Sequence, residues 1–174
     1  MLKFTRLLYF VSDHLPCKII RGDKKHPYLE RYYLCSVFGR RFYLHRFLGG
    51  DVDEALHNHP WRKSCSWLLT GGYLEFISRR KSPEDYSDLN IESRKLRAGS
   101  VNRIDSDCLH RIVKAKPETW TVFWHTIPRV QPWGFVVDEE DGATRFEEYA
   151  NGRGPDWYKR APRGKHCSER LAFQ

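Results

Sequence analysis

The chain has 174 residues, of which 40% are hydrophobic and 14% aromatic, and its formal net charge is +8. This composition excludes a wholly disordered chain, because it supplies enough apolar side chains to build a core. No run of about 18 apolar residues is present, which excludes a membrane-spanning helix. Lys3 and Arg6 interrupt the apolar start of the chain, so a signal peptide is not expected.

The positive charge is concentrated towards the two ends of the sequence. Residues 1–50 carry ten Lys or Arg against three acids, residues 151–174 carry six against two, and the residues between carry fourteen against seventeen. We therefore expect the basic residues to flank the folded body rather than line it. They would either contact nucleic acid or another polyanion, or form a solvated surface; no nucleic-acid motif accompanies them.

The five cysteines are scattered and contain no Cys-x-x-Cys pair. An odd number without regular spacing argues against a disulfide framework. We therefore expect reduced thiols and a cytoplasmic location. The cysteines are Cys17, Cys35, Cys65, Cys108 and Cys167.

The predicted elements begin with a short amphipathic helix over residues 3–13, which ends before Pro16. After a turn-rich stretch, the pattern changes to short strands separated by glycine, proline and polar turns, which is typical of an all-β sandwich or closed barrel. The first two strands flank a Gly39-Arg40 turn and the next two flank Gly71-Gly72. The strands are predicted at 28–38, 41–48, 65–70, 73–79, 91–96, 101–104, 109–115, 119–127 and 134–137.

We expect one domain over residues 1–150 and a basic, partly ordered tail over residues 151–174. An acidic run at 138–141 closes the strand-rich body. Trp157 and Tyr158 are candidate anchors for the tail.

The segment from Leu56 to Trp61 contains the pair His57 and His59. Residues i and i+2 of a strand point to the same face, so the two imidazoles would lie side by side. His110, on a later predicted strand, is the candidate third ligand. Three imidazoles predict a site for one divalent metal ion; Fe(II) is favoured, and Zn, Ni and Mn are alternatives.

These motifs resemble the two histidine-bearing motifs of the cupin superfamily over about residues 29–137. The order Gly50, His57-Asn58-His59, Gly71-Gly72, Gly99 and His110 carries the resemblance. The segments Leu56–Trp61 and Pro128–Phe135 are similar to those of small bacterial and phage cupin-like proteins. The resemblance implies a double-stranded β-helix, or jelly-roll, barrel, and makes a homodimer plausible.

The sequence departs from the family where typical cupin sites carry a glutamate, four to six residues after the second histidine. Lys63, Ser64 and Cys65 stand there. A site of three neutral histidines is similar to that of thiol dioxygenases, which have a cysteine near the missing glutamate, so Cys65 is a candidate catalytic residue; the alternative is a buried apolar side chain. The carboxylates of Asp51, Asp53 or Glu54 could instead complete the site, or form a solvated rim.

Other residues are candidates for a substrate pocket. Trp61, Trp67 and Tyr73 lie close in sequence to the histidine pair, and Arg103 and Arg129 could bind an anion through their guanidinium groups. Arg111 is a poorer candidate, because strict alternation turns it away from the face of His110. His125 is a candidate general base or fourth ligand, or else a histidine hydrogen-bonded at the barrel end.

Three function classes remain open from the sequence. The first is a three-histidine non-haem iron oxygenase, such as a dioxygenase, acting on a small, anionic molecule. The second is a non-oxidative metal-dependent isomerase, lyase or hydrolase. The third is a ligand-binding or regulatory module whose basic flanks bind nucleic acid.

Overall fold

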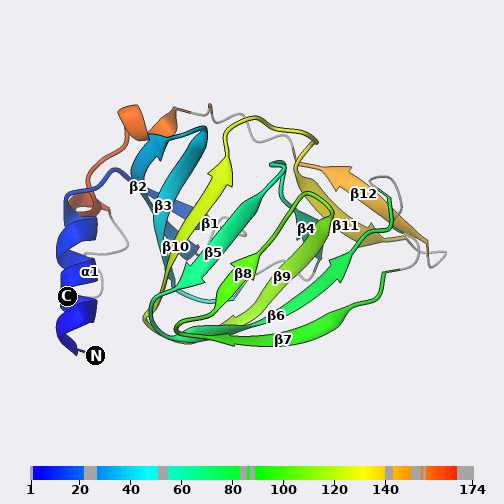
Figure 1. The fold of residues 1–174 in the computed structure, drawn as a ribbon, viewed down its shortest axis with the longest axis horizontal. Coiled ribbons are helices and arrows are strands. Elements are labelled where there is room, and N and C mark those ends of the chain that lie inside the picture. Colours follow the sequence, from blue (N-terminus) through cyan, green and yellow to red (C-terminus); the bar gives the residue numbers. More distant parts are fainter. Residues whose placement is uncertain are drawn as a thin grey trace.

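The computed structural model describes residues 2–21, 27–50, 55–82, 86, 89–139, 143–149, 154 and 156–167. These residues form two six-stranded antiparallel sheets, which face each other and leave α1 (Leu2–Asp13) outside (Figure 1). The first sheet has the order β1 (Cys17–Arg21), β2 (Pro27–Val37), β3 (Arg40–Phe47), β10 (Thr119–Thr126), β5 (Ser64–Leu68) and β8 (Val101–Arg103). The second has the order β12 (Thr144–Glu148), β11 (Gly134–Asp138), β4 (Leu56–Asn58), β9 (Cys108–Ala115), β6 (Gly72–Arg79) and β7 (Glu92–Arg97).

The order of the inner strands is that of a jelly roll. When the eight strands from β3 to β10 are counted in chain order, the first sheet reads 1-8-3-6 and the second reads 2-7-4-5. Strands β1 and β2 extend the first sheet, and β11 and β12 extend the second. The all-β jelly-roll fold expected from the sequence is therefore confirmed.

Several details differ from the predicted elements. The β2–β3 turn is formed by Phe38 and Gly39, both at positive φ (49° and 68°), one residue earlier than predicted. Strands β5 and β6, predicted on either side of Gly71-Gly72, lie in different sheets, so this glycine pair crosses between sheets rather than closing a hairpin. The short strands β1, β4 and β12 lie outside the ranges predicted as strands, and β12 extends the second sheet beyond the acidic run.

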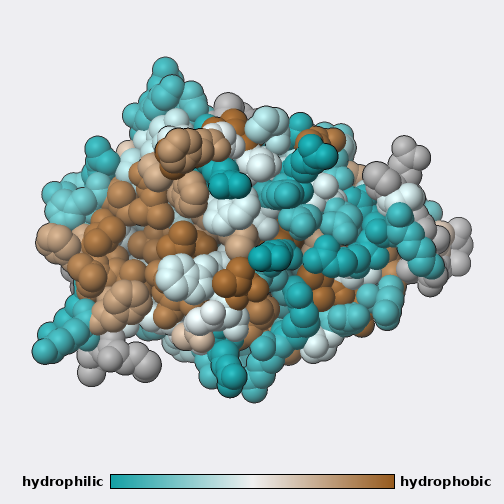
Figure 2. All heavy atoms as spheres, in the orientation of Figure 1, coloured by the Kyte–Doolittle hydropathy of each residue, from teal (hydrophilic) through white to brown (hydrophobic). Residues whose placement is uncertain are grey.

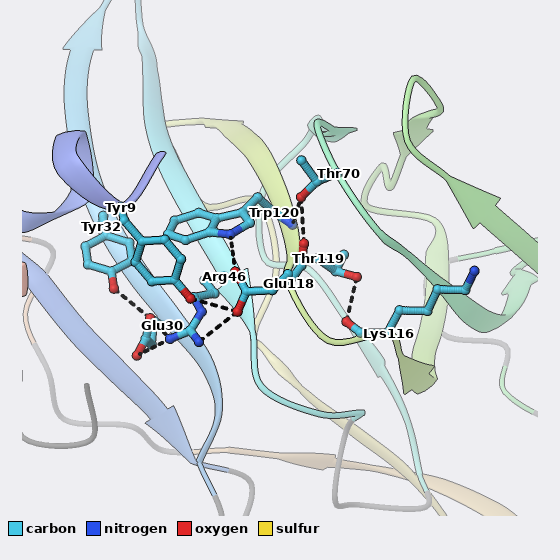
Figure 3. Close-up of polar contacts among 9 residues, drawn as sticks. All are labelled: Tyr9, Glu30, Tyr32, Arg46, Thr70, Lys116, Glu118, Thr119 and Trp120. Carbon is cyan, nitrogen blue, oxygen red and sulfur yellow. Dashed lines mark hydrogen bonds and ion pairs between the residues drawn. The ribbon is translucent and has the colours of Figure 1, made fainter. Parts of the chain in front are cut away.

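Helix α1 packs its apolar face against the outer face of the first sheet. Leu8 joins a buried cluster with Tyr32, Leu44 and Trp120. The Tyr9 hydroxyl donates a hydrogen bond to Glu118, which also accepts one from Arg46 (Figure 3). Helix and sheet are therefore joined by polar as well as apolar contacts.

One disulfide corrects the expectation that all five thiols are reduced. Cys17 of β1 is bonded to Cys167, 150 residues later. Cys167 follows the 3₁₀ helix η2 (Gly164–His166), so the disulfide holds this part of the tail against the first sheet. The scattered spacing could not reveal this bond, because only the fold brings the two residues together.

The tail is also anchored by the two aromatic residues of η1 (Trp157–Lys159) that the sequence singled out. The ring of Tyr158 stacks on Tyr33, with centroids 3.7 Å apart. Trp157 lies parallel to Tyr43, with centroids 6.3 Å apart. The tail therefore reaches the interior face of β3.

Hydrophobic side chains remain exposed over α1 and the adjoining strands of the first sheet (Figure 2). Leu7 and Phe10 of α1 are 52% and 64% exposed, and Trp67 of β5 is 51% exposed. Within the described part of the chain, no helix is both long and apolar enough to cross a membrane.

Candidate metal centre

The second sheet brings three histidines together at its inner face. His57 of β4 lies directly opposite His110 of β9, and His59 follows just beyond the end of β4. One ring nitrogen of each histidine lies within 4.8 Å of the others. The Nε2 atoms of His59 and His110 are 2.8 Å apart. The structure therefore groups the three side chains that the sequence selected as metal ligands.

The residue between the two motif histidines holds this segment in place. Asn58 points away from them and is buried. Its side-chain amide donates to the Pro132 carbonyl at 2.9 Å, and its carbonyl oxygen accepts from the Gly134 amide at 3.0 Å. Gln131 donates to the His59 backbone carbonyl at 2.8 Å. Alternation along the chain thus places the imidazoles inside and the anchoring amide outside.

A fully buried carboxylate orients His110. Glu75 of β6 accepts a hydrogen bond from the His110 Nδ1 at 2.7 Å, because a carboxylate has no proton to donate here. Asn102 and Arg94 hold the same carboxylate at 2.8 Å and 2.7 Å. The hydrogen bond to Glu75 uses Nδ1, so the other ring nitrogen of His110, Nε2, faces the histidine group. This is the arrangement in which a second residue fixes the tautomer of a metal-binding histidine.

The electrostatics favour uncharged imidazoles. Burial, followed by the proximity of His110, lowers the pKa of His57 well below its ordinary value. Burial and the neighbouring histidines do the same to the pKa of His59. Histidine must be neutral to bind a metal ion. In addition, the buried His59 Nδ1 has no hydrogen-bond partner in the described part of the chain. The three side chains fit a divalent cation with nitrogen ligands.

The histidine group lies in a cavity of about 320 Å³ between the sheets. Its walls combine aromatic rings with basic side chains. The aromatic part includes Tyr43, Phe47, Trp61, Tyr73, Phe123 and Trp157. The basic part includes Lys18, Arg21, Arg31, Arg41 and Arg129, together with His45 and His125.

Four residues predicted for the pocket do line this cavity, namely Trp61, Tyr73, Arg129 and His125. Trp61 stacks on His125, with ring centroids 3.6 Å apart. His125 Nδ1 donates to the Thr126 carbonyl at 2.7 Å, which leaves Nε2 as an acceptor. Burial, the largest cause, lowers the pKa of His125 to about 3, so this ring is neutral near pH 7.

Three other predicted residues are not brought to the cavity. Cys65 lies opposite Trp124 and Arg103 on neighbouring strands, while its neighbour Ser66 points inward. Burial, the largest cause, raises the pKa of the Cys65 thiol, which disfavours the thiolate. Trp67 and Arg103 are exposed on the same outer face. Cys65, Trp67 and Arg103 therefore point away from the cavity, contrary to the expectation that they form part of the site.

Arg111 also lies outside the cavity, over the ring of Phe76 at 5.6 Å, as alternation from His110 predicted. The carboxylates proposed as additional ligands, Asp51, Asp53 and Glu54, lie outside the described residues. No described carboxylate belongs to the histidine group, although Glu75 contacts it through His110.

The sequence reasoning missed several residues that the fold brings to the site. Glu75 could have been found, because it lies two residues after Tyr73 on the same face of one strand. No sequence pattern indicated that Arg31 and Arg41 would lie in the cavity. Their presence in the cavity corrects the expectation that the basic residues flank the barrel without lining it.

No protein-family model matches the sequence, and no curated protein matches it either. Among solved structures, Fe(II)-HppE with the alternative substrate (S)-1-HPP is similar over 67% of this chain, with 13% identity and a TM-score of 0.48. A cupin 2 conserved barrel domain protein from Rhodopseudomonas palustris is similar over 74% of this chain and 80% of its own, with 10% identity and a TM-score of 0.48. Oxalate oxidase in complex with glycolate is similar over 63% of this chain, with 17% identity and a TM-score of 0.44.

The chain spans 57% of the length of the HppE chain and 55% of the oxalate oxidase chain. Identities and TM-scores this low describe a likeness in fold alone. The assignment rests on features of this chain, which are its 1-8-3-6 and 2-7-4-5 strand order and the three inward-facing histidines. These features make the chain a jelly-roll barrel with an inward-facing histidine group, and cupin superfamily proteins are among the solved structures to which it is similar.

Proposed function

We propose that this protein is a metal-dependent enzyme in which His57, His59 and His110 hold a divalent ion, with Fe(II) favoured, and which oxidises a small anionic molecule with dioxygen. The observation that carries the proposal is the group of three imidazoles whose ring nitrogens lie within 4.8 Å of one another inside a cavity with basic walls. Neutral ligands leave the full charge of the ion for an anionic substrate. When bound, the metal would supply open coordination positions for substrate and dioxygen.

The residues around the metal site have separate tasks in this proposal. Glu75 holds the proton on His110 Nδ1 and thereby keeps Nε2 directed at the ion. His125 is neutral, donates from Nδ1 to the Thr126 carbonyl and therefore offers Nε2 as an acceptor for a substrate hydrogen bond. Trp61 covers one face of His125 and, with Phe123, excludes water from that wall. A dry wall strengthens the electrostatic contacts inside the cavity.

The placement of the basic residues favours a small anion over a polymer. Lys18, Arg21, Arg31 and Arg41 of the basic N-terminal region all line the cavity. A cavity of about 320 Å³ is at the small end of the range for ligand sites and cannot admit a folded nucleic acid. Nucleic-acid contact by the remaining basic residues, a homodimer and a cytoplasmic location stay predictions.

Metal content and oxygen consumption test the proposal. Protein purified without a metal-binding tag and reconstituted anaerobically with Fe(II) should hold about one ion per chain by elemental mass spectrometry. The His110→Ala variant should lose it, whereas His14→Ala, which changes an exposed histidine just after α1, should not. Absence of bound metal in the unmodified protein would refute the proposal.

Oxygen uptake separates the oxidative from the non-oxidative alternatives. With a panel of small acids and thiols, the iron-loaded protein should consume dioxygen only when a substrate is present. Turnover of a small acid without oxygen uptake would instead establish an isomerase, lyase or hydrolase that uses the ion as a Lewis acid.

A further inference from the structure

Arginines on the inner and outer faces of β2 and β3 have different hydrogen-bonding partners. On the outer face, Glu30 lies opposite Arg46, and the two form an ion pair at 3.2 Å. On the inner face, the next residue, Arg31, lies opposite His45 instead. Its Nε donates to the His45 Nε2 at 3.0 Å, and its guanidinium lies 5.3 Å from the centre of the Tyr43 ring. The inward arginine thus has a neutral partner where the outward one has a carboxylate.

Arg31 is a permanent charge without a described counter-ion. No carboxylate of the described residues forms an ion pair with it, and no described residue accepts a hydrogen bond from its Nη atoms. Burial lowers the pKa of Arg31, yet a guanidinium keeps its proton in a protein. His45 cannot neutralise it, because an imidazole is neutral or cationic; burial and then the Arg31 charge lower the pKa of His45 well below its ordinary value and keep it neutral. Arg31 is half-buried, and a charge that has lost part of its hydration is costly unless an opposite charge joins it.

Two basic residues on the strands that flank β2, Arg41 of β3 and Lys18 of β1, also line the cavity and are already engaged. Arg41 lies 3.6 Å from Asp156, and Lys18 lies over the Trp157 ring at 5.9 Å. Of these three neighbouring basic residues, Arg31 is the one whose unused donors face the cavity. Its Nε is occupied by His45, which leaves the edge formed by its two Nη groups. Two parallel N–H donors match the two oxygens of one carboxylate.

An aromatic surface connects Arg31 to the histidine group. The ring of Phe123 stacks on His45, the partner of Arg31, with centroids 5.0 Å apart. The same ring lies 5.8 Å from His59. Tyr43 extends the surface on the Arg31 side, 6.4 Å from Phe123. A flat ligand lying on Phe123 would thus reach the arginine with one end and the histidines with the other.

We propose that Arg31 binds the carboxylate of a small aromatic or conjugated acid, whose opposite end lies at the histidine group. This proposal deepens the proposed function. It rests on that function only for the claim that the other end of the ligand meets a metal ion at the histidine group. It makes Arg31 the residue that determines specificity for a single negative charge. A carboxylate fits better than a phosphate dianion, because one guanidinium edge with one uncompensated charge faces the ligand.

Binding of benzoate and of its neutral analogue benzamide tests this proposal, measured by titration calorimetry with the full chain. The unmodified protein should bind benzoate at least tenfold more tightly than benzamide. Arg31→Met should weaken benzoate binding about 10- to 100-fold, the range for lost hydrogen bonds between charged groups, and leave benzamide binding unchanged. Arg31→Lys should retain part of the preference. Arg103→Met, which changes an exposed arginine on the outer face, is the matched control and should bind like the unmodified protein.

Three outcomes would overturn the proposal: equal binding of benzoate and benzamide, benzoate affinity unchanged in Arg31→Met, or tighter binding of phenyl phosphate than of benzoate. The first and third comparisons use the unmodified protein, so they stand even if Arg31→Met does not fold. Metal content measured in parallel separates the two proposals. If benzoate binding depends on Arg31 but the protein binds no metal, the proposal for Arg31 stands and the proposed metal-dependent enzyme is refuted. If the protein binds one metal ion per chain but benzoate binding does not depend on Arg31, the proposal for Arg31 is refuted and the proposed metal site stands.

Discussion

Replacement of Glu30 by Gln tests whether the buried ion-pair network of Figure 3 stabilises the fold. Glu30 is fully buried, accepts the Tyr32 hydroxyl at 2.6 Å and pairs with Arg46 at 3.2 Å. Removal of one partner of a buried ion pair costs about 3–5 kcal/mol. Because Arg46 keeps its second carboxylate, Glu118, at 3.0 Å, we expect the lower end, about 3 kcal/mol. For a chain of this length that is a decrease in Tm of about 6–12 °C.

The assay is urea unfolding followed by far-UV circular dichroism, with Glu118→Gln as the matched control. The Glu118 side chain is 43% exposed, so solvent screens its contact with Arg46, and we expect a cost of about 1 kcal/mol or less. The double variant should cost more than the sum of the two, because Arg46 then has no carboxylate among the described residues. A cost below about 1 kcal/mol for Glu30→Gln, or an equal cost for both single variants, would refute this reasoning. Metal binding should not change, because the network lies on the outer face.

Three further predictions concern other parts of the molecule. Burial alone would raise the pKa of Glu118, but its hydrogen bonds and ion pair hold the pKa below the ordinary value. The Glu118 carboxylate therefore contributes its full stabilisation above the ordinary pKa, and this stabilisation is lost as the pH falls. The difference in Tm between the unmodified protein and Glu118→Gln should shrink from pH 6 to pH 3. Glu75→Gln should weaken metal binding about 10- to 100-fold in a competition assay with a chromogenic chelator, because it no longer fixes the His110 tautomer, and unchanged affinity would exclude this role. Reduction of the Cys17–Cys167 bond, or replacement of both cysteines by Ser, should lower the free energy of unfolding by about 2–5 kcal/mol, and identical melting with and without reductant would contradict the bond.

Much of the fold was predictable because its signals are local. Alternating hydrophobicity located most strands, and glycine pairs located the turns, to within a few residues. The His57 and His59 pair was predictable for the same reason, since side chains two residues apart share a face of an extended chain. The alternation that turned Arg111 away from His110 was equally local, and the structure agrees with it.

The inward or outward direction of a strand, by contrast, depends on which sheet it joins. Cys65 and Trp67 share one face of β5, and Arg103 lies on the same face of the neighbouring β8, whereas Ser66 and Asn102 occupy the inner face. Periodicity identifies two faces of a strand and cannot say which of them meets the opposite sheet. For this reason one of the two arginines selected from the sequence, Arg103, lies outside the cavity, while Arg129 lines it and the fold also brings Arg31 into it.

The sequence by itself determined that this protein is rich in short strands and that two imidazoles share one face of an extended segment, because both follow from spacing along the chain. The tertiary structure alone decided that Glu75 supports His110, that Cys17 meets Cys167 and that basic residues of the N-terminal region line the cavity. Each of these contacts joins residues far apart in the sequence. Such pairs leave no local pattern, because they exist only once the jelly-roll order has placed distant strands side by side.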